Sequence, residues 1–558
     1  MPAPTSIAEI DLTPIPGRTY FETPREWREE FIYFLMVDRF HDGVARESVG
    51  GTERSAGFTT ADDFHGGTLR GITSNLDYIA GLGCTAIWLS PVFENNAHAY
   101  HGYNINSYLG IDPHFGTKQD LVDLVEAAHA HNPPMRIILD VVINHSGDNW
   151  SYPGGHEYCY AGDQQFQFGF WRHADRPIPT ELRQEHLYHR RGAISSGHGW
   201  DQYPENQHGD IVTLKDFANG DDAAGSELIN ILIKAHCYWI RECDIDGFRV
   251  DAVKHMGELA CSRFCSGVRE YAYSLGKRGF FLFGEAASGN DELLDRYIGQ
   301  NTSRQDGEDT VFFGLNSVLD FPLAYQLQWV IKGFNDPQTL FSRLAAMEKR
   351  ALNRGELGRY RVTFADNHDS FWQGGGRIAS GAGDEQVIAT IGYLLCALGA
   401  PCIYYGTEQG FVGHGGDNQM REAMFDPDAA NDLLNRNATI YKEIAKIAAV
   451  MRAQEPLRFG RMYFREISGD GEHFGLPFGR TYTLAFSRLL YGSEVLVAYN
   501  VSDQKREDSV VVDSSLHQSG SSMSFLYGKT GSVAVQRAGN GTAFVKLPLE
   551  PHEFIILR

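Results

Sequence analysis

The sequence predicts a barrel of eight parallel β-strands alternating with helices, interrupted by an inserted domain and followed by an antiparallel β-sandwich. Three observations predict this fold class. Short apolar runs alternate with helical patterns over most of the chain. One long internal stretch has no sustained period, and the C-terminal part alternates apolar with polar residues. The expected segments are an N-terminal extension (1–26), the barrel (27–145 and 223–454), the inserted domain (146–222) and the C-terminal sandwich (455–558).

Eight apolar runs justify the barrel, because a parallel strand covered on both faces is continuously apolar. Helical patterns separate these runs. A helix with one apolar face is expected over 69–79, and another begins at Thr117, with Asp120 placed as in a capping box. The expected strands are 31–36, 85–91, 135–143, 246–251, 279–285, 315–322, 360–366 and 401–406.

The two remaining segments differ from the barrel in composition. The stretch 146–222 is rich in Gly, Pro, His, Tyr and Trp and is too long for an ordinary loop, so we expect a small domain there. Alternating runs between turn residues predict the antiparallel strands of the C-terminal sandwich. These runs are 482–486, 494–499, 509–512 and 554–557.

The charge and the apolar runs limit the classes of partner. A formal net charge of −22 argues against nucleic acid, because binding phosphates needs a basic surface. An acidic, aromatic-rich chain suits a neutral ligand with hydroxyl groups, although the charge taken alone is explained by solubility. The N-terminus has no secretory pattern, and the longest apolar run, near 392–406, is too short to span a bilayer. We therefore expect a cytoplasmic protein without a membrane partner.

The eight cysteines are scattered and form no CxxC pattern, which predicts reduced thiols in the core rather than a disulfide framework. Such thiols again favour the cytoplasm.

Acidic residues follow three of the predicted strands. Arg249 and Asp251 are two residues apart on one strand, so their side chains share a face, and the arginine is expected to keep the carboxylate ionised. Glu285 and Asp369 follow two later strands. Because the carboxyl ends of barrel strands meet at one mouth, the three acids should converge. One such acid alone is better explained as a strand cap or surface ion pair. Three acids with His145 and His368 nearby instead suit cleavage of a glycosidic bond.

On these residues the chain resembles the α-amylase superfamily, glycoside hydrolase family 13, from about residue 27 to its end. All four short sequence regions of that family are matched. They are Asp140-Val141-Val142-Ile143-Asn144-His145, Gly247 to His255, Phe283-Gly284-Glu285 and Phe364 to Asp369. The resemblance implies that Asp251 is the nucleophile, Glu285 the general acid and base, and Asp369 the carboxylate that holds sugar hydroxyls.

The same resemblance implies further substrate contacts. Arg249 would orient Asp251, and Tyr103 would stack under the sugar that forms the covalent intermediate, in a subsite lined by His145 and His368. Lys254 and His255 resemble a pair on the leaving-group side that favours α-1,4-glucans. The aromatic residues of the insert could also stack on sugar rings, but most of them are expected in its core: Trp150, Phe170, Trp171 and Trp200.

The resemblance also implies a structural calcium ion and no organic cofactor. Asn144, Asp216 and the backbone carbonyl of His255 would be its ligands, and oxygen donors of this kind suit calcium. The alternative is that Asn144 and Asp216 hydrogen-bond the insert to the barrel without a metal.

We therefore expect a retaining hydrolase of α-1,4-glucosidic bonds in maltooligosaccharides or related α-glucans. Alternatives are an α-glucan transglycosylase, a hydrolase of short or cyclic oligosaccharides, and a non-catalytic relative of the kind found in transporter subunits. The last is disfavoured because such relatives lose the carboxylates and gain a membrane anchor. Asn104 stands where many α-amylases have Trp, and the insert is unusual, so chain length and endo or exo attack remain open.

Overall fold

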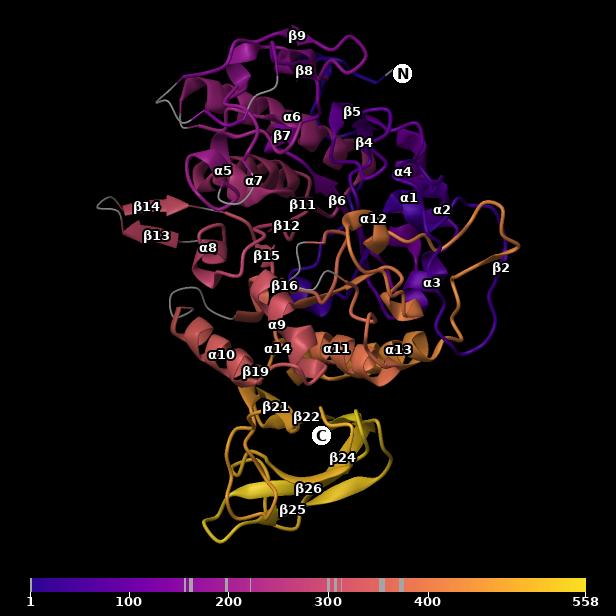
Figure 1. Cartoon of the computed structure of the whole chain (residues 1–558), viewed down its shortest axis with the longest axis vertical. Helices are drawn as coiled ribbons and strands as arrows, with labels where there is room; N and C mark the ends of the chain where they lie inside the picture. Colours follow the sequence, from indigo (N-terminus) through magenta and orange to yellow (C-terminus); the bar gives the residue numbers. More distant parts are fainter. Residues whose placement is uncertain are drawn as a thin grey trace.

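The computed structural model describes residues 3–154, 157–159, 164–195, 199–220, 222–298, 302–305, 309–312, 314–350, 357–370 and 376–558. Figure 1 shows a large body that contains the barrel and the insert, with the C-terminal sheet attached at one end.

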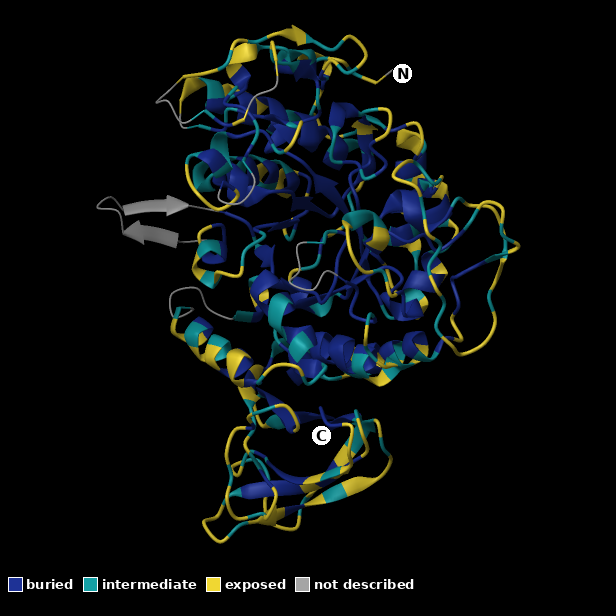
Figure 2. Cartoon of the chain, in the orientation of Figure 1, coloured by how far each residue is buried: buried dark blue, intermediate teal, exposed yellow. Residues whose placement is uncertain are grey.

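The centre of the large body is a closed barrel of eight parallel strands, as predicted. The strands follow one another around the barrel in chain order, and the last pairs with the first, Tyr33 opposite Ile403. They are continuously buried because neither face meets water (Figure 2). The strands are β1 (Ile32–Leu35), β3 (Ala86–Leu89), β6 (Arg136–Val141), β11 (Gly247–Val250), β12 (Phe281–Gly284), β15 (Ser317–Leu319), β16 (Arg361–Thr363) and β17 (Ala400–Tyr404).

Helices surround the barrel and turn their apolar faces inward. The capping box expected at Thr117 and Asp120 is present, with both reciprocal hydrogen bonds made. The longer helices are α4 (Lys118–Ala130), α6 (Ala223–Cys243), α7 (Glu258–Ser274), α9 (Phe321–Ile331), α10 (Gln338–Arg350), α11 (Asp384–Cys396) and α13 (Thr439–Ala453). Shorter ones are α1 (Val37–Phe40), α8 (Asp291–Asp295), α12 (Asp417–Met420) and α14 (Glu455–Phe459).

The single helix expected over 69–79 is wrong. Two helices occupy this stretch, α2 (Leu69–Thr73) and α3 (Leu76–Gly81). The side chain of Ser74 bonds the carbonyl of Arg70 at 3.1 Å, and that of Asn75 bonds Gly71 at 2.8 Å. These side-chain hydrogen bonds compete with the backbone hydrogen bonds of a continuous helix, and the helix is interrupted at Ser74 and Asn75.

The insert contains short elements around a small aromatic core. Trp150 is fully buried there, as expected, and Tyr188 and Phe217 pack nearby. Phe170 and Trp200, by contrast, are 64% and 37% exposed, so the core role expected for most of the four aromatic residues does not hold for these two. The elements are β7 (His145–Ser146), β8 (Trp150–Ser151), β9 (Phe170–Trp171), η3 (Thr180–Leu182), η4 (Glu185–Leu187), α5 (Glu205–His208) and β10 (Lys215–Asp216).

One pairing fixes the insert to the barrel end. Strand β10 pairs antiparallel with β7, which places Asp216 opposite His145. A hairpin of β4 (Phe93–Asn95) and β5 (Ile105–Ile111) lies after the second barrel strand. The exact boundaries of the predicted domains stay predictions.

The C-terminal part is an antiparallel sheet of nine strands, which confirms the predicted class. Residues from β21 to β27 turn inward to form a second core, separate from that of the barrel. The strands are β19 (Arg461–Phe464), β20 (Ile467–Ser468), β21 (Thr483–Leu490), β22 (Ser493–Asn500), β23 (Arg506–Val511), β24 (Ser522–Tyr527), β25 (Ser532–Arg537), β26 (Ala543–Leu549) and β27 (Phe554–Leu557).

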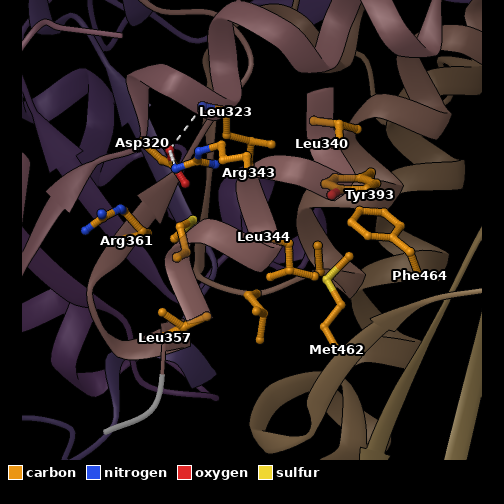
Figure 3. A pocket seen from close by; sticks show the side chains of 13 residues that line it. Asp320, Leu323, Leu340, Arg343, Leu344, Leu357, Arg361, Tyr393, Met462 and Phe464 are labelled. Carbon is orange, nitrogen blue, oxygen red and sulfur yellow. Dashed lines mark hydrogen bonds and ion pairs between the residues drawn. The ribbon is translucent and has the colours of Figure 1, made fainter. Parts of the chain in front are cut away.

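A small cavity of about 40 Å³ marks the junction of barrel and C-terminal sheet (Figure 3). Met462 and Phe464 of β19 face Tyr393 of α11 on one side. On the other side Arg343 of α10 contacts Asp320 at 2.6 Å. These two belong to a junction cluster in which each arginine has a carboxylate partner: Arg343, Arg350, Arg361, Asp291, Asp295 and Asp320.

Within the described part of the chain, no helix combines the length and apolarity needed to cross a bilayer. The eight cysteines are all free, and all but Cys159 are buried, in line with the expected core thiols. The cytoplasmic location expected from the sequence stays a prediction.

Candidate active site

Three acidic side chains meet in one cleft at the carboxyl ends of the barrel strands. Asp251 directly follows β11, Glu285 directly follows β12, and Asp369 lies on the segment after β16. All three line a cavity of about 520 Å³ between the barrel and the insert. The cleft is of the size that small-molecule sites have in proteins.

Arg249 contacts Asp251, Glu285 and a further acid, Asp140. Its Nη1 lies 2.6 Å from Oδ1 of Asp251, and its Nη2 lies 3.1 Å from Oε2 of Glu285. Nη1 also donates to Asp140 at 2.9 Å, because Arg249 stands opposite Asp140 in the pairing of β6 with β11. The sequence assigned no role to Asp140, although an aspartate inside an apolar strand was a visible signal.

Asp140, Arg249, Asp251 and Glu285 form one buried group, here called the catalytic cluster. Burial raises the pKa of two of its acids. Burial raises the pKa of Asp251 well above its usual value, and Glu285 adds to the rise while Arg249 opposes it. Burial likewise raises the pKa of Asp140 to about 6. Arg249 opposes the rise at Asp251, in the direction expected from the sequence, but its one guanidinium is shared among three carboxyl groups. That Arg249 keeps Asp251 ionised stays a prediction.

Asp369 has a cation of its own, Arg421, which the sequence analysis missed. Nη2 of Arg421 lies 3.2 Å from Asp369, and Nε donates to the carbonyl of His368 at 2.9 Å. Burial raises the pKa of Asp369 to about 6, with Arg421 acting against this rise. Arg421 comes from an aperiodic segment after the last barrel strand, where no pattern pointed to it.

The aromatic residues predicted to bind substrate line the same cleft. The rings of Tyr103 and His368 are stacked with centroids 5.4 Å apart, and the Tyr103 hydroxyl donates to Asp140 at 2.9 Å. Burial lowers the pKa of His145 to about 4 and that of His368 well below its usual value. Both imidazoles are therefore neutral near pH 7 and can hydrogen-bond a neutral ligand without adding charge.

Lys254 and His255 lie on the side of Glu285. Nζ of Lys254 donates to the carbonyl of Ala287 at 2.9 Å and to Asp201 of the insert at 3.0 Å. The ring of His255 donates to the carbonyl of Asn206 at 2.6 Å, and burial lowers its pKa to about 3.

The residues predicted to hold a metal ion lie between barrel and insert. Asn144 Nδ2 is 3.4 Å from Asp216 Oδ1, and Oδ1 of Asn144 is buried without a hydrogen-bond partner. Burial and the nearby Asp210 raise the pKa of Asp216, whose other oxygen lies 2.6 Å from His189. Over the described residues, no group of three or more His, Cys, Asp or Glu side chains is arranged to hold a metal. A cation here would need amide and backbone oxygens besides Asp216.

Comparison with known proteins agrees with this geometry. Residues 34–446 match the family model described as "Alpha amylase, catalytic domain". An α-amylase from Streptomyces lividans is 28% identical over 550 residues, covering 85% of this chain and 55% of that protein. A cyclomaltodextrin glucanotransferase from Klebsiella oxytoca is 28% identical over 437 residues, covering 73% and 62%. The chain thus spans about three fifths of the length of these curated relatives or less.

Solved structures show the same fold. The crystal structure of the α-amylase from Geobacillus thermoleovorans, complexed with acarbose, superposes with a TM-score of 0.70 at 24% identity. The match covers 96% of this chain and 99% of that one. With the family model matched across the whole barrel, the chain belongs to the α-amylase family.

Proposed function

We propose that the protein breaks α-1,4-glucosidic bonds of maltooligosaccharides or related α-glucans with retention of configuration. The observation that carries this proposal is the pair Asp251 and Glu285 on one guanidinium, in a cleft that Asp369 also lines. Retaining enzymes need two carboxyl groups about 5–5.5 Å apart, and a shared arginine supports such a spacing. Membership of the α-amylase family supports the substrate class.

The reaction is a double displacement. Asp251 attacks the anomeric carbon while Glu285 gives its proton to the departing oxygen. In the second step Glu285 takes a proton from water or from a sugar hydroxyl, whose oxygen displaces Asp251. Asp369 would hold sugar hydroxyls, and Tyr103 would stack under the ring that becomes bound to Asp251.

Arg249 suits the role of Asp251 in this reaction. It lies 2.6 Å from Asp251 and acts against the rise of that residue's pKa, which favours an ionised nucleophile. A retaining enzyme needs one carboxyl group ionised as the nucleophile and another protonated as the acid.

A second candidate function is transfer of the glucan to a sugar instead of water, since both named activities occur among the relatives. Hydrolysis of short or cyclic glucans is a further alternative. The deciding experiment is a time course of products from maltoheptaose, with and without added glucose. Shorter products alone indicate hydrolysis, and chains longer than the donor indicate transfer. If maltoheptaose stays intact both with and without glucose, the proposed activity on linear glucans is refuted. Cyclic glucans would then be tested.

We also propose a structural calcium ion bound by Asn144, Asp216 and the carbonyl of His255. The buried Asn144 Oδ1 without a partner and the adjacent carboxylate support a hard, oxygen-ligated cation. When bound, the ion would hold insert and barrel together at the edge of the cleft. The test is the melting temperature of EDTA-treated protein with and without added calcium. A rise that is lost in Asp216→Asn is expected, and an equal melting temperature in both conditions would contradict the site.

A further inference from the structure

A second cavity lies at the amino ends of the barrel strands, at the opposite end from the catalytic cleft. It is lined by the first residues of β12 and β17, Phe281 and Ala400, and by the residues just before β15 and β16, Asn316 and Tyr360. Its volume is about 130 Å³. Sites that enclose a whole small molecule measure roughly 300–1,000 Å³, so this cavity suits one chemical group of a ligand.

Four of the described residues that line this cavity are arginines, and they come from three segments distant in sequence. The chain as a whole has 71 Asp and Glu against 49 Lys and Arg, so this gathering of positive charge runs against its composition. Glu26 is the only acid among the described lining residues. The arginines are Arg25, Arg28 of η2 (Trp27–Glu29), Arg269 of α7 and Arg359 of η7 (Leu357–Arg359).

Two of these arginines have a role in the fold. Nε of Arg28 lies 3.3 Å from Oε2 of Glu26, and its guanidinium lies over the ring of Phe459, 4.7 Å from the centroid. Nη2 of Arg359 binds the other oxygen of the same carboxylate. Glu26 is therefore already shared between two arginines.

Arg25 and Arg269 have no such carboxylate. In the part of the chain that the structure describes, neither forms an ion pair, whereas each arginine of the junction cluster has an acidic partner. Nη2 of Arg269 donates to the carbonyl of Gly314 at 2.8 Å, which fixes the side chain beside the cavity without neutralising it. Like charges gathered in one place repel each other, and an anion between them removes that repulsion.

A phosphate group suits these donors better than a carboxylate does. Its tetrahedral oxygens point in several directions, so guanidinium groups from different segments can each bond one or two of them. A carboxylate has only two oxygens in one plane, and those of Glu26 are taken by Arg28 and Arg359. Arg25 and Arg359 are exposed, so the rest of a phosphate monoester would extend into solvent beside them.

We propose that this cavity binds a phosphate group through Arg25 and Arg269, with Arg28 and Arg359 adding positive charge from the other sides. The group is either free phosphate or the phosphate of a monoester. No residue of the catalytic cleft takes part, so the site is separate from the proposed function. A bound phosphate would link residues 25–28 with α7 and η7, and would stabilise the folded chain by mass action.

The test is isothermal titration calorimetry of the full chain at constant ionic strength, because salt screens interactions between charges. The probes are inorganic phosphate, glucose 1-phosphate and, as a carboxylate, acetate. The variants are Arg25→Gln, Arg269→Gln and the double variant. Arg278→Gln is the matched control, because Arg278 is an exposed arginine shortly before β12 that does not line the cavity.

We expect saturable binding of one phosphate per chain, weakened roughly tenfold by each single variant, the effect of losing a charge-assisted hydrogen bond. The double variant should bind neither phosphate probe, and Arg278→Gln should bind both as the wild type does. Acetate should bind the wild type at least about tenfold more weakly than phosphate. Tighter binding of glucose 1-phosphate than of inorganic phosphate would identify a monoester as the ligand, and equal binding would identify free phosphate.

Three results would overturn the inference. The first is no saturable binding of either phosphate probe at millimolar concentrations. The second is unchanged phosphate binding in the variants, which would locate the anion elsewhere on the protein. The third is acetate binding as tight as that of phosphate. Circular dichroism would show that each variant is folded, and Arg25→Gln tests the site by itself because an exposed side chain can be replaced without loss of the fold.

Discussion

Two groups of charged side chains in this protein differ in the balance of positive and negative charge. The catalytic cluster has one arginine, Arg249, for three carboxyl groups. The junction cluster beside the C-terminal sheet has three arginines for three aspartates. Burial raises the pKa of Asp251 and Asp140 in the first cluster. In the second, hydrogen bonding and charge from Arg343 outweigh burial and lower the pKa of Asp291.

The comparison shows that burial alone does not mark a functional acid. The catalytic cluster is buried and has more carboxyl groups than arginines, and the pKa of two of its acids is raised. The partly buried junction cluster has a carboxylate for each arginine. The junction cluster pairs its charges and holds α8, α9, α10 and the start of β16 together. We expect substitutions in the catalytic cluster to lower activity and substitutions in the junction cluster to lower stability.

The largest effect is expected at the catalytic acids. Asp251→Asn and Glu285→Gln should each lower kcat/KM by about 10³-fold or more, since each removes a group that forms or breaks bonds. Steady-state kinetics on maltoheptaose would measure this loss, with circular dichroism to show an intact fold. Near-normal rates in either variant would refute the assignment, and Asp291→Asn provides a carboxylate control with activity retained.

Arg343→Met should act on stability instead. Without Arg343, buried Asp320 loses its ion-pair partner at 2.6 Å, whereas Asp291 keeps Arg350 and Arg361. We expect a loss of about 3 kcal/mol in the free energy of unfolding. Urea unfolding would measure the loss, and kcat/KM below the transition should stay within about twofold of wild type. A stable variant with poor catalysis would contradict the division between the clusters.

Two isosteric variants should change stability with opposite signs. The pKa of Asp369 is raised from 3.8 to about 6, so folding takes up a proton between these values and stability falls as pH rises through that window. Asp369→Asn should therefore be more stable than wild type at pH 7, by about 2 kcal/mol, and equal to it below about pH 4.

Asp291 has the opposite sign, because its pKa is lowered from 3.8. Its contribution is present above that value and is lost as pH falls below it, so Asp291→Asn should be less stable than wild type at pH 7 and converge on it in acid. Unfolding curves over a range of pH would measure both variants. A stability change in the same direction for Asp369→Asn and Asp291→Asn would contradict the opposite pKa shifts of these two residues.

The smallest effect is expected from Arg421→Gln. Arg421 holds the pKa of Asp369 lower than burial alone would, so its loss should raise that pKa further. The acid limb of kcat/KM should then move up by about one pH unit. Arg350→Gln in the junction cluster serves as control, and an unmoved limb in Arg421→Gln would remove Asp369 from the ionisations that limit activity.

The sequence determined the barrel and the positions of its acids. Apolar runs without alternation specify strands buried on both faces, and their order around the barrel follows chain order. Once those strands form, Asp251 and Glu285 must lie at the same mouth, because both directly follow parallel neighbours. The helix break at Ser74 was not predicted, since competition by short polar side chains is weak in any one position.

Only the tertiary structure decided how charge is shared in the cleft. Sequence spacing paired Arg249 with Asp251, but the pairing of β6 with β11 and of β11 with β12 made that arginine serve Asp140 and Glu285 as well. Arg421 reaches the cleft from a segment without period, where local pattern carries no direction. The periodicity of a sequence determines which face of its helix or strand a side chain lies on. The residues that this side chain contacts come from elements distant in sequence. Those contacts influence its pKa and therefore its chemistry.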